Sequence, residues 1–187
     1  VLTLSGANTY TGDTSISAGA LALDPGSSLA STNLYVGAGS VFDVSAINFS
    51  LTANQSLSGN GTVTGSVGTV AGSKIVAGAD GTFGTNTFNN NLSFVSGASA
   101  YFDLSATANG ANDEIVLNGA NSALTCGGAT LAIKCGSTLD LVNDYTLFNL
   151  TGANPSILGN FASTPVWTGT TPANAAGFSV VTVGNKV

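Results

Sequence analysis

Carboxylates are the side chains of this chain whose spacing could support catalysis. Asp113 and Glu114 are adjacent, and Asp140 and Asp144 flank a turn, so either pair could resemble the two carboxylates of a glycoside hydrolase. Adjacent residues of an extended strand point to opposite faces, however, so Asp113 and Glu114 cannot both serve one site. Asp140 and Asp144 are better interpreted as residues that cap or solvate their turn. We therefore predict no catalytic residue.

Cations are too few for the other reaction classes that we considered. The chain has no Arg and no His, and its Lys residues are Lys74, Lys134 and Lys186. A serine nucleophile would lack the His that activates it. A polysaccharide lyase, the strongest enzyme alternative by fold analogy, would lack the cation cluster that neutralises its acidic substrate. Nucleic acid is excluded as a partner for the same reason, because phosphates need clustered Lys and Arg.

Oxygen ligands offer two candidate positions for Ca²⁺, the Asp80-Gly81 turn and the segment from Asn112 to Glu114. Neither matches a calcium-binding loop, so we predict no metal site and no cofactor. Cys126 and Cys135 could form a disulfide in an exported protein and stabilise the fold by up to about 3 kcal/mol. Two separate buried thiols are the alternative, and the spacing of the two cysteines does not favour a redox or metal role.

The elements that would position these residues are short strands. Apolar residues recur at a spacing close to two, and 25 Gly in 187 residues are too many for helix interiors. Charged residues make up 6% of the chain, yet no run of about 18 apolar residues exists that could span a membrane as a helix. We predict strands at Leu2–Leu4, Thr14–Ile16, Ala20–Leu23, Leu34–Val36, Val41–Val44, Ser50–Leu51, Gly61–Thr64, Ser73–Ala77, Asn91–Val95, Ala100–Leu104, Glu114–Asn118, Ala129–Ile133, Thr138–Val142 and Tyr145–Leu150.

The first three of these strands fit within about two dozen residues, which is the length of one coil of a β-solenoid. A chain of 187 residues would then form roughly eight short coils, an all-β fold. Residues 1–150 would form the coils. Pro155, Pro165 and Pro172 then enter the pattern, together with the single Trp167, so residues 151–187 are predicted to form an irregular last coil or cap of the same domain.

The opening segment also carries a family pattern. Residues 2–24 contain the run Gly-Ala-Asn-Thr-Tyr-Thr-Gly and closely resemble the autotransporter-associated β-strand repeat of exported bacterial surface proteins. A weaker similarity spans residues 112–167, whose order looks like the segment that closes such an array. The resemblance implies a right-handed parallel β-helix, secreted or displayed at the bacterial cell surface, with no catalytic activity. Val1 begins midway through the pattern, so we expect a segment of a longer precursor.

Two functional hypotheses follow. The first is a non-enzymatic structural β-solenoid, a stalk, adhesive rod or self-assembling filament or surface layer. Its partners would be further copies stacked end to end or laterally, other parts of the precursor, or surface glycans. The alternative is a carbohydrate-binding or carbohydrate-cleaving module, for which exposed aromatic rings would provide stacking platforms. The candidate rings, which we interpret mostly as packing residues, are those of Tyr10, Tyr35, Tyr101, Tyr145 and Trp167.

Overall fold

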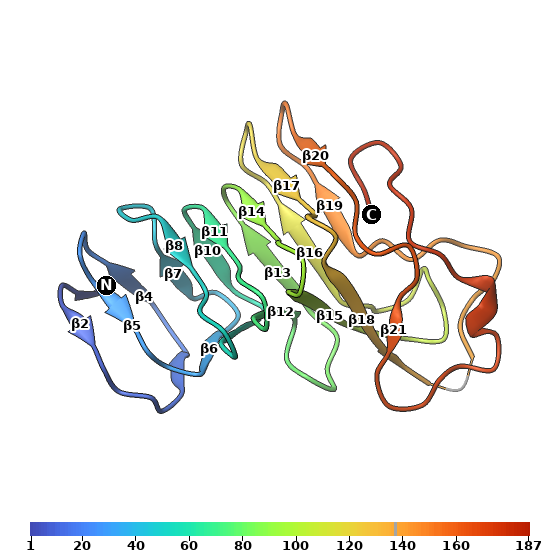
Figure 1. The fold of residues 1–187 in the computed structure, drawn as a ribbon, viewed down its shortest axis with the longest axis horizontal. Coiled ribbons are helices and arrows are strands. Elements are labelled where there is room, and N and C mark those ends of the chain that lie inside the picture. Colours follow the sequence, from blue (N-terminus) through green and yellow to red (C-terminus); the bar gives the residue numbers. More distant parts are fainter. Residues whose placement is uncertain (137) are drawn as a thin grey trace.

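The computed structural model describes residues 1–136 and 138–187. These residues form a stack of short parallel strands, and the chain passes through three faces in each coil (Figure 1). The prediction of an all-β parallel β-helix is confirmed. In the described part of the chain, seven coils are formed, close to the eight expected.

All named strands pair in parallel, and they fall into three faces that we call sheets 1, 2 and 3. Sheet 1 contains β1 (Leu2–Leu4), β4 (Ala20–Leu23), β7 (Val41–Asp43), β10 (Thr62–Thr64), β13 (Thr85–Phe88), β16 (Glu114–Leu117) and β19 (Phe148–Leu150). Sheet 2 consists of a first pair, β2 (Ala7–Asn8) and β5 (Ser28–Leu29), followed by β8 (Phe49–Ser50), β11 (Val67–Gly68), β14 (Leu92–Ser93), β17 (Ala123–Thr125) and β20 (Ser156–Leu158). Sheet 3 contains β3 (Thr14–Ile16), β6 (Asn33–Val36), β9 (Ser56–Gly59), β12 (Lys74–Ala77), β15 (Ser99–Leu104), β18 (Thr130–Cys135) and β21 (Val166–Trp167).

The coils become longer toward the C-terminus. In sheet 1, Leu21 pairs with Phe42, whereas Leu117 pairs with Leu150. The second pair is separated in sequence by more than one and a half times as many residues as the first. Most of the added residues lie between sheet 3 and sheet 1. Residues 78–84 follow β12 and residues 105–113 follow β15, whereas the connection between β9 and β10 is very short. The added connections therefore project from one corner of an otherwise regular stack (Figure 1).

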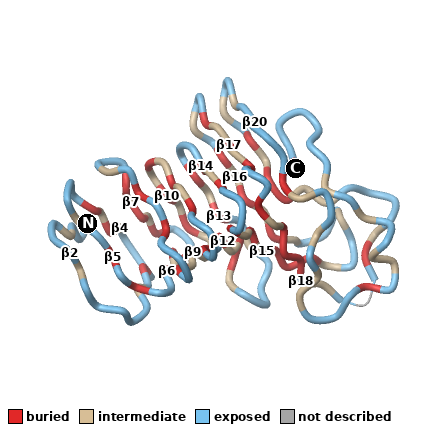
Figure 2. The backbone as a smooth tube through the Cα atoms, in the orientation of Figure 1, coloured by how far each residue is buried: buried red, intermediate tan, exposed pale blue. Residues whose placement is uncertain are grey.

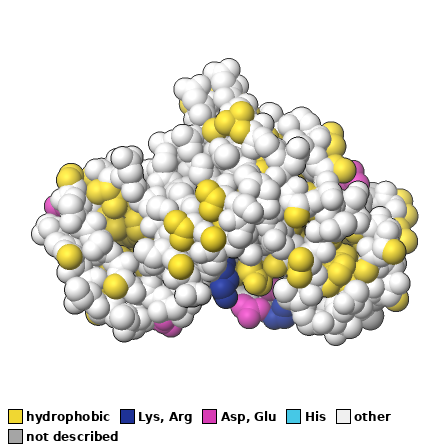
Figure 3. Space-filling view, viewed as in Figure 1, with side chains coloured by type: hydrophobic (Ala, Val, Ile, Leu, Met, Phe, Trp, Pro, Cys, Tyr) yellow, Lys and Arg dark blue, Asp and Glu magenta, His cyan; other side chains and the backbone are white. Residues whose placement is uncertain are grey.

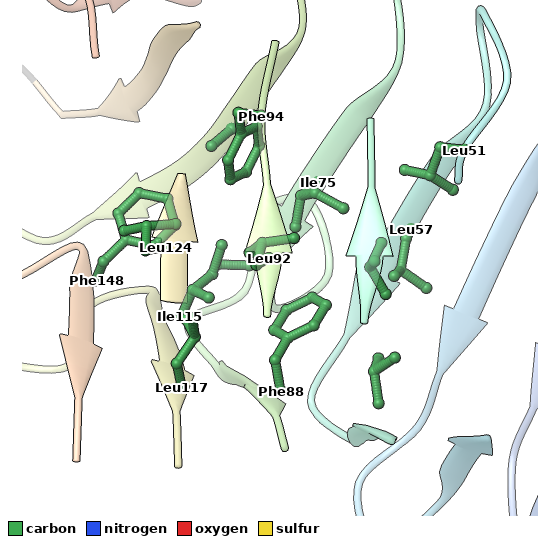
Figure 4. Packing of buried hydrophobic residues seen from close by; sticks show 14 of the residues in the cluster. Leu51, Leu57, Ile75, Phe88, Leu92, Phe94, Ile115, Leu117, Leu124 and Phe148 are labelled. Atoms are coloured by element: carbon green, nitrogen blue, oxygen red, sulfur yellow. The ribbon is translucent and has the colours of Figure 1, made fainter. Parts of the chain in front are cut away.

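Alternation within each strand creates the interior. Strands such as β6 and β12 alternate exposed or half-buried residues with buried ones, because successive side chains of a strand point to opposite faces (Figure 2). The inward side chains form one continuous core of stacked aliphatic and aromatic residues (Figure 4). Around Phe148 the ring centroids of Phe102 and Phe161 lie 5.3 and 5.0 Å away. Apolar packing of this kind therefore holds successive coils together.

The C-terminal segment completes the seventh coil and then covers it. Residues 151–187 contribute β20, β21 and the short 3-10 helix η1 (Ala175–Gly177). The Val187 carbonyl accepts hydrogen bonds from the backbone N–H groups of Leu147 and Phe148 at 2.8 and 3.1 Å. The ring centroid of Phe178 lies 6.0 Å from that of Trp167. Backbone groups at this end of the core are thereby partly satisfied by the chain itself.

One predicted strand, Thr138–Val142, is wrong. These residues form a turn, because the Asp140 carboxylate accepts backbone N–H bonds from Val142 at 2.8 Å and from Asn143 at 3.3 Å. Such local side-chain acceptors compete with sheet pairing. As a result Leu141 and Val142 are 63% and 90% exposed, although the alternation of Leu139 and Leu141 with polar residues is typical of a strand.

Candidate functional site

The strongest candidate site is a groove of about 400 Å³ on the outer face of sheet 3. Residues 78–84 form a loop beside it, and Lys and acidic side chains gather at this point of the molecule, where the outline is hollowed (Figure 3). Two of the three Lys residues of the chain contribute to it. We call it the outer groove and define it by Ser58, Lys74, Val76, Asp80, Tyr101, Asp103 and Lys134.

The strand register explains why these residues meet. Ser58 pairs with Val76, and Val76 pairs with Tyr101, so three outward side chains form a row across β9, β12 and β15. Asp103 pairs with Lys134 at the end of β15 and β18. Neighbouring strands lie about 4.8 Å apart, so each row runs along the axis of the stack. Residues far apart in sequence therefore line one continuous groove.

Two carboxylates fix the loop that borders the groove. Asp113 is fully buried and accepts hydrogen bonds from the Gly84 N–H at 2.8 Å and the Asp103 N–H at 2.7 Å. Asp103 in turn accepts a 2.6 Å bond from the Gly81 N–H. Hydrogen bonds to carboxylates are stronger than neutral ones, so both residues anchor residues 78–84 on sheet 3.

Burial has a strong effect on Asp113. Desolvation raises the pKa of its carboxyl from 3.8 to about 7. The two hydrogen bonds that the carboxylate accepts from backbone N–H groups lower the pKa, but by less than desolvation raises it. The nearby charge of Asp103 raises this pKa further. Asp113 therefore titrates near neutral pH, and its shift follows from an anchoring position beneath the loop rather than from an open catalytic one.

The lysines of the groove differ in their partners. The Lys134 ammonium donates to the Asp80 carboxylate at 2.5 Å, and both side chains are well exposed. This hydrogen bond, together with the nearby Asp103 charge, raises the pKa of Lys134. The Lys74 ammonium lies 5.5 Å from the centroid of the Tyr101 ring, in a cation–π contact. Lys134 is therefore paired with Asp80 and lies near Asp103, whereas Lys74 contacts the Tyr101 ring. Asp113, buried beneath the loop, is a third carboxylate of the groove lining.

The carboxylate pairs considered from the sequence occupy separate environments. Asp113 is buried, whereas Glu114 begins β16 and is half-buried, as opposite faces of an extended segment require. Asp140 caps its turn, and hydrogen bonds from Asn143 and Val142 lower its pKa. Asp144 is exposed. At the candidate calcium position, Asp80 is paired with Lys134, and the described residues contain no group of three potential metal-ligating side chains.

The two cysteines are free thiols, so the disulfide considered between Cys126 and Cys135 is not formed. Cys126 lies at the corner after β17, where its carbonyl accepts the Ala129 N–H, and Cys135 is the last residue of β18. A strand of the length of β18 spans about 16 Å, well beyond the limit of about 7 Å between bonded Cα atoms. Burial raises the pKa of the Cys126 thiol to about 11. The alternative interpretation, separate thiols, fits this arrangement.

The five aromatic residues considered as sugar platforms do not form one surface. Tyr101 lines the outer groove, and Tyr35 lies in the same outward row but outside the groove. Tyr10 is exposed on the first coil, whereas Tyr145 and Trp167 are half-buried and pack against Phe178. Tyr145 and Trp167 instead line a separate, largely apolar pocket of about 330 Å³, whose lining also includes Asp144 and Lys186.

Sequence reasoning missed the association of Asp103 with Asp113 and treated the lysines as scattered. Asp103 lies in β15 and Asp113 just before β16, and the connection between them is closed by Asn112, whose amide donates to the carbonyls of Thr107 and Ala108 at 3.0 Å. Lys74 and Lys134 lie in strands of different coils. The register between coils is the signal that would have placed these residues together. That register can be predicted only if the lengths of the connections between strands are known.

The comparisons with known proteins identify the opening coil. Residues 1–23 match the model of the passenger-associated-transport-repeat, which confirms the resemblance to autotransporter passenger repeats. A repeat of this type implies an exported protein. No curated protein and no solved structure matches the chain. Within residues 1–136 and 138–187, no helix has the length and apolarity needed to cross a membrane.

Proposed function

We propose that this chain is a non-enzymatic structural segment of an exported bacterial cell-surface protein, in which the stacked coils serve as a rigid rod or stalk. The observation that carries the proposal is the continuous parallel ladder of seven coils that begins with a passenger repeat. In sheets 1 and 3 each internal strand is hydrogen-bonded to the coil before and the coil after it, so bending the rod would break many bonds at once.

The surface supports the same role. Charged residues are 6% of the chain, and few Lys, Asp or Glu side chains are visible on the face shown in Figure 3. Trypsin could cleave only after three Lys residues, and two of these, Lys74 and Lys134, lie within strands β12 and β18. Backbone held in a sheet is a poor protease substrate, because cleavage requires local unfolding. Such a surface suits an element exposed outside the cell.

Further coils provide the natural partner. Among the described residues, β1 pairs with β4 and its other edge is open to further pairing. An open strand edge is a template for another strand. We therefore propose that this edge continues the ladder with another part of a longer precursor or with a second copy, end to end.

Deletion of one coil tests the rod. Phe42 is replaced in register by Val63 when residues 42–62 are removed, because both belong to the same row of sheet 1. The shortened chain should keep its β-rich circular dichroism, and X-ray scattering should show a rod shorter by about 4.8 Å, one strand spacing. Deletion of residues 42–52, which removes half a coil, is the matched control and should prevent folding. Equal behaviour of the two deletions would contradict a modular rod.

The non-enzymatic part has its own test. The purified chain should release no reducing ends and no unsaturated products from neutral or acidic polysaccharides. Polysaccharide cleavage that Asp103→Asn abolishes would overturn this part of the proposal. A second candidate function, carbohydrate binding, is favoured by one observation, the outer groove.

A further inference from the structure

We propose that the outer groove binds an uncharged oligosaccharide, which lies along the axis of the stack across β9, β12, β15 and β18. This binding function goes beyond the structural role of a rod and does not depend on it. It rests on three properties of the groove: a floor with an aliphatic and an aromatic side chain, hydrogen-bonding walls that carry both ammonium and carboxylate groups, and a regular strand spacing along its length.

The floor is the outward row of Ser58, Val76 and Tyr101. All three side chains are half-buried, so they present a continuous surface without projecting far into solvent. A pyranose ring has faces of C–H groups, which pack on aromatic and aliphatic surfaces. Ligand sites typically combine such an apolar floor with a few well-placed polar groups. This row can therefore contact the ring faces of successive sugar units.

The walls provide hydrogen-bond donors and acceptors on both sides. Lys74 lies on one side of the row, and the Asp103–Lys134 register pair lies on the other, beside Asp80 on the loop. A sugar hydroxyl both donates and accepts, so it can bridge an ammonium and a carboxylate. The groove lining carries both ammonium and carboxylate groups in near balance, which favours an uncharged ligand over a polyanion or a polycation.

The groove is prepared for an extended ligand. Its rows repeat at the strand spacing of about 4.8 Å, close to the length of one sugar unit in an extended chain. The loop wall is held by the N–H bonds of Gly81 and Gly84 to the buried Asp103 and Asp113 carboxylates. A wall fixed in this way loses little entropy on binding.

A glycan array tests the proposal with the full chain. The array carries neutral hexose oligosaccharides of different lengths and, beside them, uronic-acid and sulfated oligosaccharides. Wild-type protein should bind neutral oligosaccharides. Tyr101→Ala should weaken that binding by roughly tenfold, as expected for the loss of one stacking contact. Tyr35→Ala is the matched control, because Tyr35 is also half-buried in the same outward row but outside the groove, and it should bind like wild type.

A second variant keeps the test independent of folding. Lys74 is exposed, so Lys74→Gln should leave the melting temperature unchanged and still weaken binding severalfold. The proposal is overturned if no neutral oligosaccharide binds, if only acidic or sulfated ones bind, or if both groove variants bind like wild type. The scattering profile of the rod is unaffected by these outcomes, so failure here is distinct from failure of the structural proposal.

Discussion

Asp113 should make the stability of this protein fall as pH rises through the range from about 4 to about 7. The unfolded chain releases the proton of this carboxyl near its ordinary pKa of 3.8, whereas the folded protein holds it up to a pKa of about 7. Between these values the folded state binds more protons, so the free energy of unfolding decreases with increasing pH. The difference between the two pKa values corresponds to a loss of up to about 4 kcal/mol.

Asp113→Asn should remove most of this dependence. The amide stays neutral at every pH. One of the two backbone N–H groups that donate to Asp113 would, however, face the NH₂ group of Asn and lose its acceptor, which lowers the free energy of unfolding by about 1–3 kcal/mol. Urea unfolding followed by circular dichroism at several pH values between 4 and 8 measures the slope. Asp24→Asn, which changes an exposed carboxyl, is the control and should keep the wild-type slope. A wild-type stability that rises with pH across this range, or an unchanged slope in Asp113→Asn, would refute the reasoning.

Three further substitutions or modifications have defined outcomes. Asn86 is fully buried and neither atom of its amide has a hydrogen-bond partner among the described residues, so Asn86→Leu should raise the free energy of unfolding by about 1 kcal/mol or more, measured in urea. Gly59→Ala should destabilise the fold by more than about 2 kcal/mol in the same assay, because the added Cβ would collide with the Val36 carbonyl oxygen and because Gly59 has a φ of 119°, which side-chain-bearing residues rarely adopt. Iodoacetamide should alkylate the half-buried Cys135 in the native protein and leave Cys126 unmodified until denaturation, and mass spectrometry would detect the reverse order or a disulfide if the arrangement were different.

The regular part of the fold was predictable because local chemistry determines it. The predicted strands Leu2–Leu4, Thr14–Ile16 and Ala20–Leu23 coincide with β1, β3 and β4. In β4 half-buried and buried residues alternate, and Gly or Asn residues lie in the turns between the three strands. The same reasoning failed at Thr138–Val142, where the Asp140 carboxylate accepts a hydrogen bond from the Val142 N–H and stabilises a turn instead. Periodicity alone does not distinguish these two cases.

The outer groove was not predictable from the sequence, because its residues meet only through the register of several coils. Tyr101 lies beside Val76 of the preceding coil, and Lys134 lies beside Asp103 in the same way. These pairings depend on the connections, and those connections have no periodicity from which their lengths could be anticipated. From the sequence, Lys74 and Lys134 indicated only that cations are too few, because their association with Asp80 and Asp103 is visible only in the three-dimensional stack.

The growth of the coils toward the C-terminus explains why the groove lies where it does. The early coils, such as the one from Leu21 to Phe42, have short connections between sheet 3 and sheet 1. The loop 78–84 adds a wall at one corner, and the buried carboxylates of the next coil hold that wall in place. The repeated coils therefore supply the floor of the groove, and the inserted loop 78–84 adds a wall on one side of it. A rod of this kind can acquire a binding site without any change in the ladder that keeps it rigid.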